Sequence, residues 1–168
     1  MPPISGKKVI YLVQAANAVI GASALLPANQ TEGSWTQEQE MVDEQTKSGR
    51  NVGYGPKSEN FELTLYAEQG DEGLAAIQWT YDNEEQLKVW RVELDLNANG
   101  KHNARFGYTI IESIEMTEPS DGFVEVSVSL PVVGKTQAGE LAPLPADLIE
   151  AAMYDFETPG ETGAPATP

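Results

Sequence analysis

Four segments of this chain alternate apolar and polar side chains with a period of two, and this alternation restricts the fold more than any other feature. The clearest is FELTLYA, where Phe61, Leu63 and Leu65 share one face. A period of two places successive side chains on opposite faces of a β-strand. The same pattern recurs at 88–96, 105–117 and 123–132. A mainly β fold with half-buried strands is therefore predicted. In the second and third segments the faces expected to be buried carry Trp90, Val92, Leu94 and Leu96, and Phe106, Tyr108, Ile110, Ile114 and Met116.

Turn signals between these segments predict how the strands connect. The Asn-Gly of NANGK (97–101) and the Pro and Gly of EPSDG (118–122) are typical of turns. Neighbouring strands joined in this way pair antiparallel, so a meander is expected over 86–133. Two apolar segments near the start, 8–15 and 18–23, are expected to add a hairpin or strand pair.

One segment has a helical period. In DEGLAAIQWTYDNEEQ, Leu74, Ile77 and Tyr81 recur on one helix face, and the alanines between them favour a helix. Asp71 is placed to cap the first turn. The pattern predicts one helix at about 71–83, flanking the sheets.

Residues 27–58 contain few apolar side chains and are expected to form a long polar loop, with an extended strand arm over 34–42. A structureless loop of that length inside a compact domain is usually functional or disordered. Its last part, TKSGRNVGYGPKS, combines three glycines with three bases, as phosphate-binding loops do. Pro56 removes an amide where such a loop needs one, and a strand follows instead of a helix. This argues against a nucleotide site.

The C-terminal part, 136–168, carries six acids, five prolines and no base. Within it, DLIEAAMYDF predicts a short helix at about 147–156 with one apolar face, which favours docking onto protein. We therefore expect a β-sandwich domain over 1–135, followed by an acidic, proline-rich arm over 136–168.

The charge balance is strongly negative. Twenty-six acidic and ten basic residues give a formal net charge of −16, which repels a phosphate backbone. The chain has no cysteine and one histidine, His102, which is expected to be exposed in a polar turn. No spacing of carboxylates marks a catalytic or metal site. We expect no enzyme activity, no cofactor and no metal. No stretch approaches the roughly 18 uninterrupted apolar residues of a membrane-spanning helix.

In their order along the chain, these parts resemble the major tail proteins of long-tailed, non-contractile phages, of the lactococcal type. The resemblance covers about residues 4–134, and the extended C-terminal part departs from it. The segments that carry it are PISGKKVIYLV, DEQTKSGRNVGYGPKSENFELTLYA, GDEGLAAIQWTYDNEEQLKVW and FVEVSVSLPVVGK.

This resemblance implies a tail tube protein with an antiparallel β-sandwich or barrel and one flanking helix. Six copies would form a ring, and rings would stack into a tube through which the genome passes without specific binding. The implied partners are further copies and the tape-measure, distal tail and tail-terminator proteins. The implied location is the virion tail, and the host cytoplasm during assembly, with no membrane contact.

The resemblance also gives the polar loop a role as an assembly arm that reaches a neighbouring subunit. Its bases would meet acidic surface there, and the C-terminal helix would dock on a neighbour or on the tube exterior. The residues expected at contacts between subunits are Trp35, Lys47, Arg50, Tyr54, Lys57, Leu148, Ile149 and Met153.

Two other functions stay open. One is the tube of a contractile secretion apparatus. The other is an acidic β-sandwich that binds carbohydrate or protein through Trp35, Trp79 and Trp90.

Overall fold

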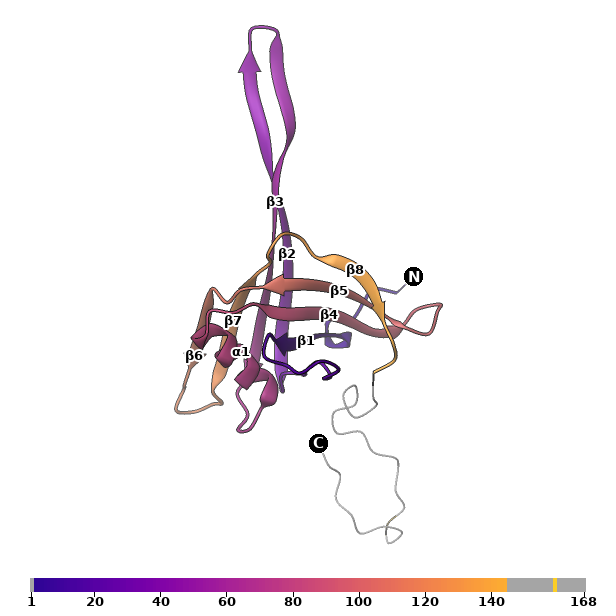
Figure 1. The fold of residues 1–168 in the computed structure, drawn as a ribbon, viewed down its shortest axis with the longest axis vertical. Helices are drawn as coiled ribbons and strands as arrows, with labels where there is room; N and C mark the ends of the chain where they lie inside the picture. Colours follow the sequence, from indigo (N-terminus) through magenta and orange to yellow (C-terminus); the bar gives the residue numbers. More distant parts are fainter. Residues whose placement is uncertain (1, 145–158, 160–168) are drawn as a thin grey trace.

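The fold, seen in a computed structural model that describes residues 2–144 and 159, is a sandwich of two antiparallel sheets with a long hairpin projecting from one end (Figure 1). The first sheet (the β1 sheet) has the strand order β1 (Val9–Ala15), β4 (Leu87–Leu96), β5 (His102–Thr109), β8 (Gln137–Leu141). The second (the β3 sheet) has the order β2 (Gln30–Thr46), β3 (Gly49–Tyr66), β7 (Glu125–Pro131), β6 (Ser113–Thr117). A 3-10 turn, η1 (Gly6–Lys8), precedes β1. The predicted mainly β, antiparallel architecture is confirmed.

The core lies between the two sheets. From the β3 sheet, the predicted apolar faces of β3 and β7 point inward, and their side chains are almost completely buried. These side chains are Phe61, Leu63, Leu65, Val126, Val128 and Leu130. From the β1 sheet, Tyr11 meets the edge of the Phe61 ring, with ring centroids 5.7 Å apart. Edge-to-face contact of this kind adds to the burial of both rings.

The predicted buried face of β4 is confirmed only in part, because Val92 is completely buried whereas Trp90, Leu94 and Leu96 are not. Leu87 and Val89 point into the core, whereas Trp90 lies on the opposite face and packs on Phe106 with ring centroids 5.1 Å apart. Both faces of β4 carry apolar side chains, so a period of two cannot show which face is internal. That second face is itself partly covered, since Leu12 is 2% exposed and borders a groove shared with Leu141.

The single α-helix within the described residues is α1 (Glu72–Asp82), close to its predicted bounds. The Asp71 carboxylate accepts the backbone N–H of Gly73 at 2.9 Å, which confirms the N-cap. Its other oxygen accepts the N–H of Ala28 at 2.9 Å and so ties the helix start to the segment before β2. Ile77 is fully buried, whereas Tyr81, predicted on the same face, is exposed.

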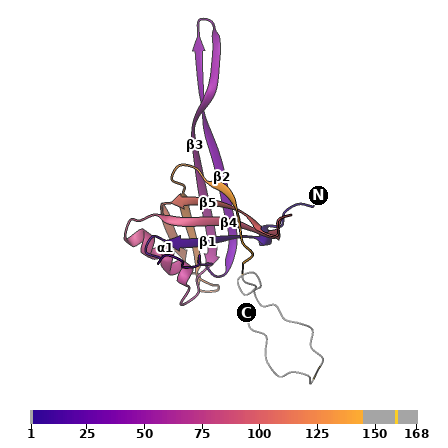
Figure 2. The same cartoon turned by 45° about the vertical axis from the view of Figure 1, so that its right-hand side comes forward.

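The expected long loop at 27–58 is mostly a β-hairpin. Strands β2 and β3 pair from Gln30 to the turn at Thr46–Gly49, and their outer half extends well beyond the body (Figures 1 and 2). Only 34–42 was predicted to be extended. Few apolar side chains occur in the outer half, so its alternation is too short for a strand to be predicted from it.

Three further connections differ from prediction. Residues 18–23 form no strand, and the only pairing nearby is an isolated bridge between Val13 and Leu25. The segment 105–117 is split into β5 and β6, which belong to different sheets. The meander over 86–133 therefore holds only for β4–β5 and β6–β7, because the chain crosses the sandwich between them.

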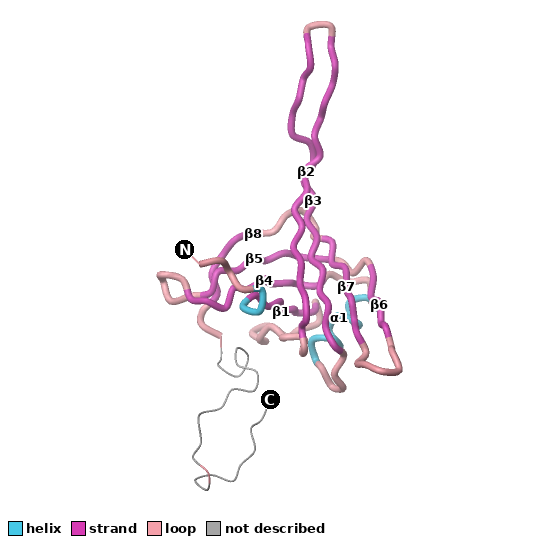
Figure 3. The backbone as a smooth tube through the Cα atoms, turned by 180° about the vertical axis from the view of Figure 1, so that it is seen from behind, coloured by secondary structure: helices cyan, strands magenta, loops and turns pink. Residues whose placement is uncertain are grey.

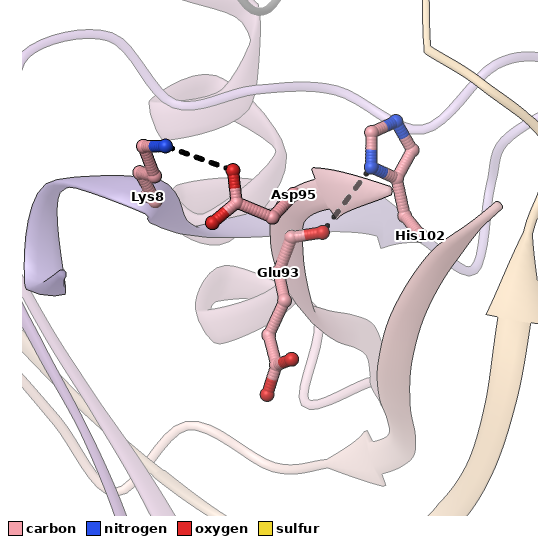
Figure 4. Close-up of polar contacts among 4 residues, drawn as sticks. All are labelled: Lys8, Glu93, Asp95 and His102. Carbon is pink, nitrogen blue, oxygen red and sulfur yellow. Dashed lines mark hydrogen bonds and ion pairs between the residues drawn. The ribbon is translucent and has the colours of Figure 1, made fainter. Parts of the chain in front are cut away.

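The sheet also continues past the expected boundary at residue 135, since β8 pairs with β5 along five residues. His102, expected to be exposed, is 1% exposed because the chain after β8 returns over it. Its Nδ1 lies 3.2 Å from the carbonyl oxygen of Glu93 (Figure 4), and its Nε2 accepts the N–H of Leu144 at 3.2 Å. Nearby, the exposed pair Lys8–Asp95, 2.8 Å apart, joins β4 to the turn before β1 (Figure 4).

No helix within the described residues is long and apolar enough to cross a membrane.

Candidate assembly surfaces

The outward face of the β3 sheet is polar and acidic. Because the apolar side chains of β3 and β7 point inward, their neighbours in the chain point outward, and the register extends this face to β2 and β6. The outward side chains are Glu32, Ser34, Thr36, Asn60, Glu62, Thr64, Tyr66, Ser113, Glu115, Thr117, Glu125, Ser127, Ser129 and Pro131. The body parts of the four strands (30–39, 58–66, 113–117 and 125–131) contain no lysine, arginine or histidine. The face therefore combines hydroxyls with several uncompensated carboxylates.

The projecting hairpin, here called the arm (residues 40–55), exposes apolar side chains on one face. Met41 and Tyr54 are directly paired, and they are 63% and 85% exposed. Val52 lies two residues along from Tyr54 on the same face and is also exposed. A two-stranded hairpin is at most marginally stable by itself in water. An exposed apolar strip on such a hairpin indicates a surface that another molecule covers.

The end of the arm is held by local contacts. Thr46 Oγ1 donates to the carbonyl of Gly49 at 2.8 Å and accepts the N–H of Ser48, which closes the turn around Lys47. Arg50 makes two hydrogen bonds of 2.7 Å to Asp43 across the hairpin. The hydrogen bond from Arg50 holds the pKa of the Asp43 carboxyl below its usual value.

A bulge interrupts the arm where it meets the body. Gln39 pairs with Lys57 and Met41 with Tyr54, so Glu40 faces two residues, Gly55 and Pro56. Bulges are positions where a strand tolerates proline. A Cβ on Gly55 would lie 3.0 Å from the Glu40 carbonyl oxygen, so the close approach of the two strands favours glycine here. Pro56, which argued against a phosphate-binding loop, therefore lies at a bulge between two paired strands.

Below this bulge lies a buried carboxylate, Glu59, which is 8% exposed. It accepts hydrogen bonds from the N–H and hydroxyl of Thr136 at 2.6 and 2.7 Å, from Trp35 Nε1 at 3.0 Å and from Gln37 Nε2 at 3.2 Å. Burial by itself would raise the pKa of Glu59, but the hydrogen bonds from Thr136, Trp35 and Gln37 outweigh it and hold that pKa below its usual value. We call these four residues the joint, because they tie the base of the arm to the chain before β8.

Trp35 is also covered by two cations. The guanidinium carbons of Arg91 and Arg105 lie 5.4 and 5.1 Å from the centroid of its ring. This geometry is that of a cation–π contact. Trp35, predicted to contact a neighbouring subunit, is therefore already used within its own chain.

The other predicted contact residues lie along the arm and its base. Lys47 stands in the turn, Arg50 pairs with its own Asp43, Tyr54 is the most exposed member of the apolar strip, and Lys57 borders the joint. Leu148, Ile149 and Met153, and the helix expected at 147–156, lie outside the described residues. The sequence did not single out Glu59 or Thr136. Glu59 is one of many acids, and its partner Thr136 is far away along the chain.

Within residues 2–144, no group of three or more histidine, aspartate or glutamate side chains is placed to hold a metal ion. The alternating Asp95, Asn97 and Asn99, which could suggest calcium, are used in other ways. Asn97 accepts the N–H groups of Asn99 and Lys101 within the turn, and both asparagines donate to Glu140.

A sandwich with one acidic face and a projecting, partly apolar arm is the architecture of a subunit that neighbouring copies complete. The sequence model of a family described as phage tail tube protein matches residues 3–138. The chain belongs to this family, which confirms the resemblance drawn from the sequence.

A protein sequence and a solved structure, both from phage SPP1, are similar to the chain. It is 43% identical over 162 residues to the tail tube protein gp17.1* of Bacillus phage SPP1, covering 95% of this chain and 61% of that relative. The solved structure of the SPP1 tail tube superposes with a TM-score of 0.82 at 37% identity, covering 96% of this chain and 95% of that one. The tail of a gene transfer agent particle, refined with C6 symmetry, shares the fold with a TM-score of 0.64 at 15% identity, covering 80% and 98% of the two chains.

Proposed function

We propose that this chain builds a phage tail tube: six copies close into a ring, rings stack, and the phage genome passes through the bore. Its role is structural and involves no catalysis. The observation that carries the proposal is the acidic outward face of the β3 sheet, which we assign to the bore. The family membership and the six-fold symmetry of the gene transfer agent tail support the arrangement.

The bore assignment follows from charge. A DNA backbone carries a negative charge every ~1.7 Å along the duplex axis. Lysine or arginine on the wall would hold such a strand, whereas carboxylates and hydroxyls leave it free to move. The outward face of the β1 sheet carries Lys88 and a row of aromatic rings instead, and therefore suits the tube exterior.

Assembly also explains the arm. Its apolar strip at Met41, Val52 and Tyr54 needs a cover that the chain's own body does not provide. Stacked rings supply one if each arm reaches onto the next ring. Lys47, Tyr54 and Lys57 are then contact residues, and Arg50 contributes through its pair with Asp43.

The remaining parts of the proposal concern partners. The acidic C-terminal part, through Leu148, Ile149 and Met153, docks on a neighbouring copy or on the tube exterior. Tape-measure, distal tail and tail-terminator proteins meet the tube inside and at its two ends. Subunits assemble in the host cytoplasm and end in the virion tail.

The absence of cysteine from the sequence makes a direct test of the bore assignment simple. Single-cysteine variants Ser127→Cys, on the acidic face, and Asn99→Cys, in the β4–β5 turn, are assembled and treated with a maleimide attached to a large polymer. We expect the polymer to label both free subunits, and to label only the Asn99→Cys variant in tubes. Equal labelling of both variants in tubes, or no tubes from the unaltered protein under the electron microscope, would overturn the proposal.

A further inference from the structure

A groove of about 560 Å³ opens at the arm end of the body, where β2 and β3 leave the sandwich. One wall is made by the base of the arm and the other by β5 and the chain leading into β8. Three bases line it: Lys57 from β3, Arg105 from β5 and Lys135 from the segment before β8. The whole chain has only ten lysines and arginines, so this is a local concentration of positive charge.

None of the three bases forms a salt bridge within the part of the chain that the structure describes, where the ion pairs are Lys8–Asp95, Arg50–Asp43 and Arg91–Glu93. Two acids also line the groove: Glu59, which is buried and hydrogen-bonded to the other residues of the joint, and Glu38 on β2. Three positive charges therefore face two negative ones, and the lining keeps an excess of positive charge. Lys57 and Lys135 are both exposed and available to an outside partner.

The end of the body opposite the groove carries exposed acidic side chains. The loop from β3 into α1 and the loop that joins β6 to β7 both lie away from the arm (Figures 1 and 3). Their exposed acids are Glu68, Glu72, Glu118 and Asp121. Neither 67–72 nor 118–124 contains a base. This end of the body therefore carries acids without bases, whereas the end next to the arm combines the three groove bases with acids, namely Glu38, Glu59 and Glu112.

We infer that the groove lined by Lys57, Arg105 and Lys135 receives the acidic loops of a second copy, stacked head to tail. A surface that pairs with a different surface of an identical molecule generates open stacks rather than closed dimers. The inference rests on the proposed tube and identifies which surfaces of consecutive rings meet. It also gives the stack a direction, because two ends that carry only acids repel each other.

A second copy fits the groove better than nucleic acid does. Phosphate binding needs a basic surface that extends over several contacts, and here a few bases are surrounded by a strongly acidic chain. The matching acidic loops, in contrast, are present on every copy at equal concentration, at the end that a stacked neighbour would present.

The test is a charge-swap experiment on the full chain. The Lys57→Glu/Lys135→Glu variant reverses the groove, and Glu118→Lys/Asp121→Lys reverses one acidic loop. We expect each double variant to raise the protein concentration needed for tubes by about tenfold or more, a loss on the order of one good ion pair. The variant that combines all four substitutions restores attraction, so its tubes should return. Tubes are quantified by sedimentation and electron microscopy, and folding is checked by thermal melting.

Lys7→Glu/Lys101→Glu is the matched control, because it makes the same change in net charge on exposed residues outside the groove. It should assemble like the unaltered protein. The inference is overturned if the groove variant assembles normally, if the control is equally impaired, or if the combined variant stays monomeric although its melting is unchanged. If the unaltered protein forms no tubes, the proposed function itself fails, which is a separate result.

A second measurement does not depend on charge reversal. Added salt should raise the concentration that the unaltered protein needs for tubes, and should do so less in Lys57→Gln/Lys135→Gln. Identical salt dependence in the two proteins would overturn the inference, even if the reversed variants fold poorly.

Discussion

Glu59 shows how one side chain connects three parts of the structure. Its carboxylate joins β2 through Trp35 and Gln37, and the entrance to β8 through Thr136. Hydrogen bonds to a charged acceptor are stronger than those to a neutral one. The joint therefore requires the ionised form of the carboxyl.

The first prediction is that Glu59→Gln lowers the free energy of unfolding by about 1–3 kcal/mol. An amide turns an NH₂ group toward donors that expect an oxygen, so at least one buried partner is left unsatisfied. Chemical denaturation at neutral pH measures the loss. Glu62→Gln, three residues along β3 on the exposed acidic face, is the control and should change stability little. Equal effects of the two substitutions would contradict the role of the joint.

The same substitution gives a pH dependence with a definite sign. The pKa of Glu59 is lower in the folded chain than its ordinary value. Its contribution is therefore complete above the ordinary glutamate pKa and is lost as the pH falls through the folded-state pKa. The stability difference between the unaltered protein and Glu59→Gln should shrink on acidification over that range.

Among the larger elements, the arm is the one that the sequence described least well. Phe61, Leu63 and Leu65 revealed the body part of β3 because one face is apolar and the other polar. The outer part of the same strand has only Val52 and Tyr54 as apolar side chains on one face, among glycines and polar residues, so the contrast is weak. Interactions that do not depend on hydrophobicity, namely the backbone ladder and the Arg50–Asp43 pair, form this hairpin.

The sequence predicted only some of the residues on the functional surfaces, as it predicted only part of the arm. Lys57 was identified because a base stands out in an acidic chain. Its companions in the groove, Arg105 and Lys135, come from distant segments that only the folded sandwich brings together. Trp90 was assigned to the core because Val92 shares its face, although Leu87 and Val89 fill the core instead. The alternation thus predicted most strands of the body and the family resemblance gave the role of the chain, but neither predicted which distant residues meet.

The second prediction concerns the apolar strip of the arm. Val52→Ser/Tyr54→Ser should abolish tubes while the melting temperature of the free subunit changes little, because both side chains are more than half exposed. Tyr66→Ser, on the outward face of β3, removes an aromatic ring from another exposed position and serves as a comparison. Intact tubes in the double variant would show that the strip has no part in assembly.

For the whole molecule, the boundary between body and C-terminal arm becomes testable. The body uses residues past 135: Thr136 donates to Glu59, β8 pairs with β5, and the N–H of Leu144 reaches His102. These contacts lie on both sides of the β1 sheet. A body that ends before them would lose a strand and expose the edge of β5.

The third prediction compares two truncations. Removing 145–168 should leave the melting temperature nearly unchanged, whereas removing 136–168 should destabilise the body strongly, because the second cut also deletes β8 and the donors to Glu59. Circular dichroism melts of the two purified proteins measure the difference. Similar melting of both truncated proteins would show that the strand β8 contributes little to the fold. Tube formation by the shorter deletion then tests separately whether the C-terminal part is needed between copies.

The continuity of β2 and β3 from the body into the arm has a mechanical consequence. A pull on the tip of the arm acts along these strands, parallel to the ladder that joins β3 to β7 (Figure 1). In that direction the hydrogen bonds are loaded in shear, so many of them must break together rather than one after another. A filament whose links have this geometry resists stretching, while the bulge at Gly55 and Pro56 leaves each link a place to bend.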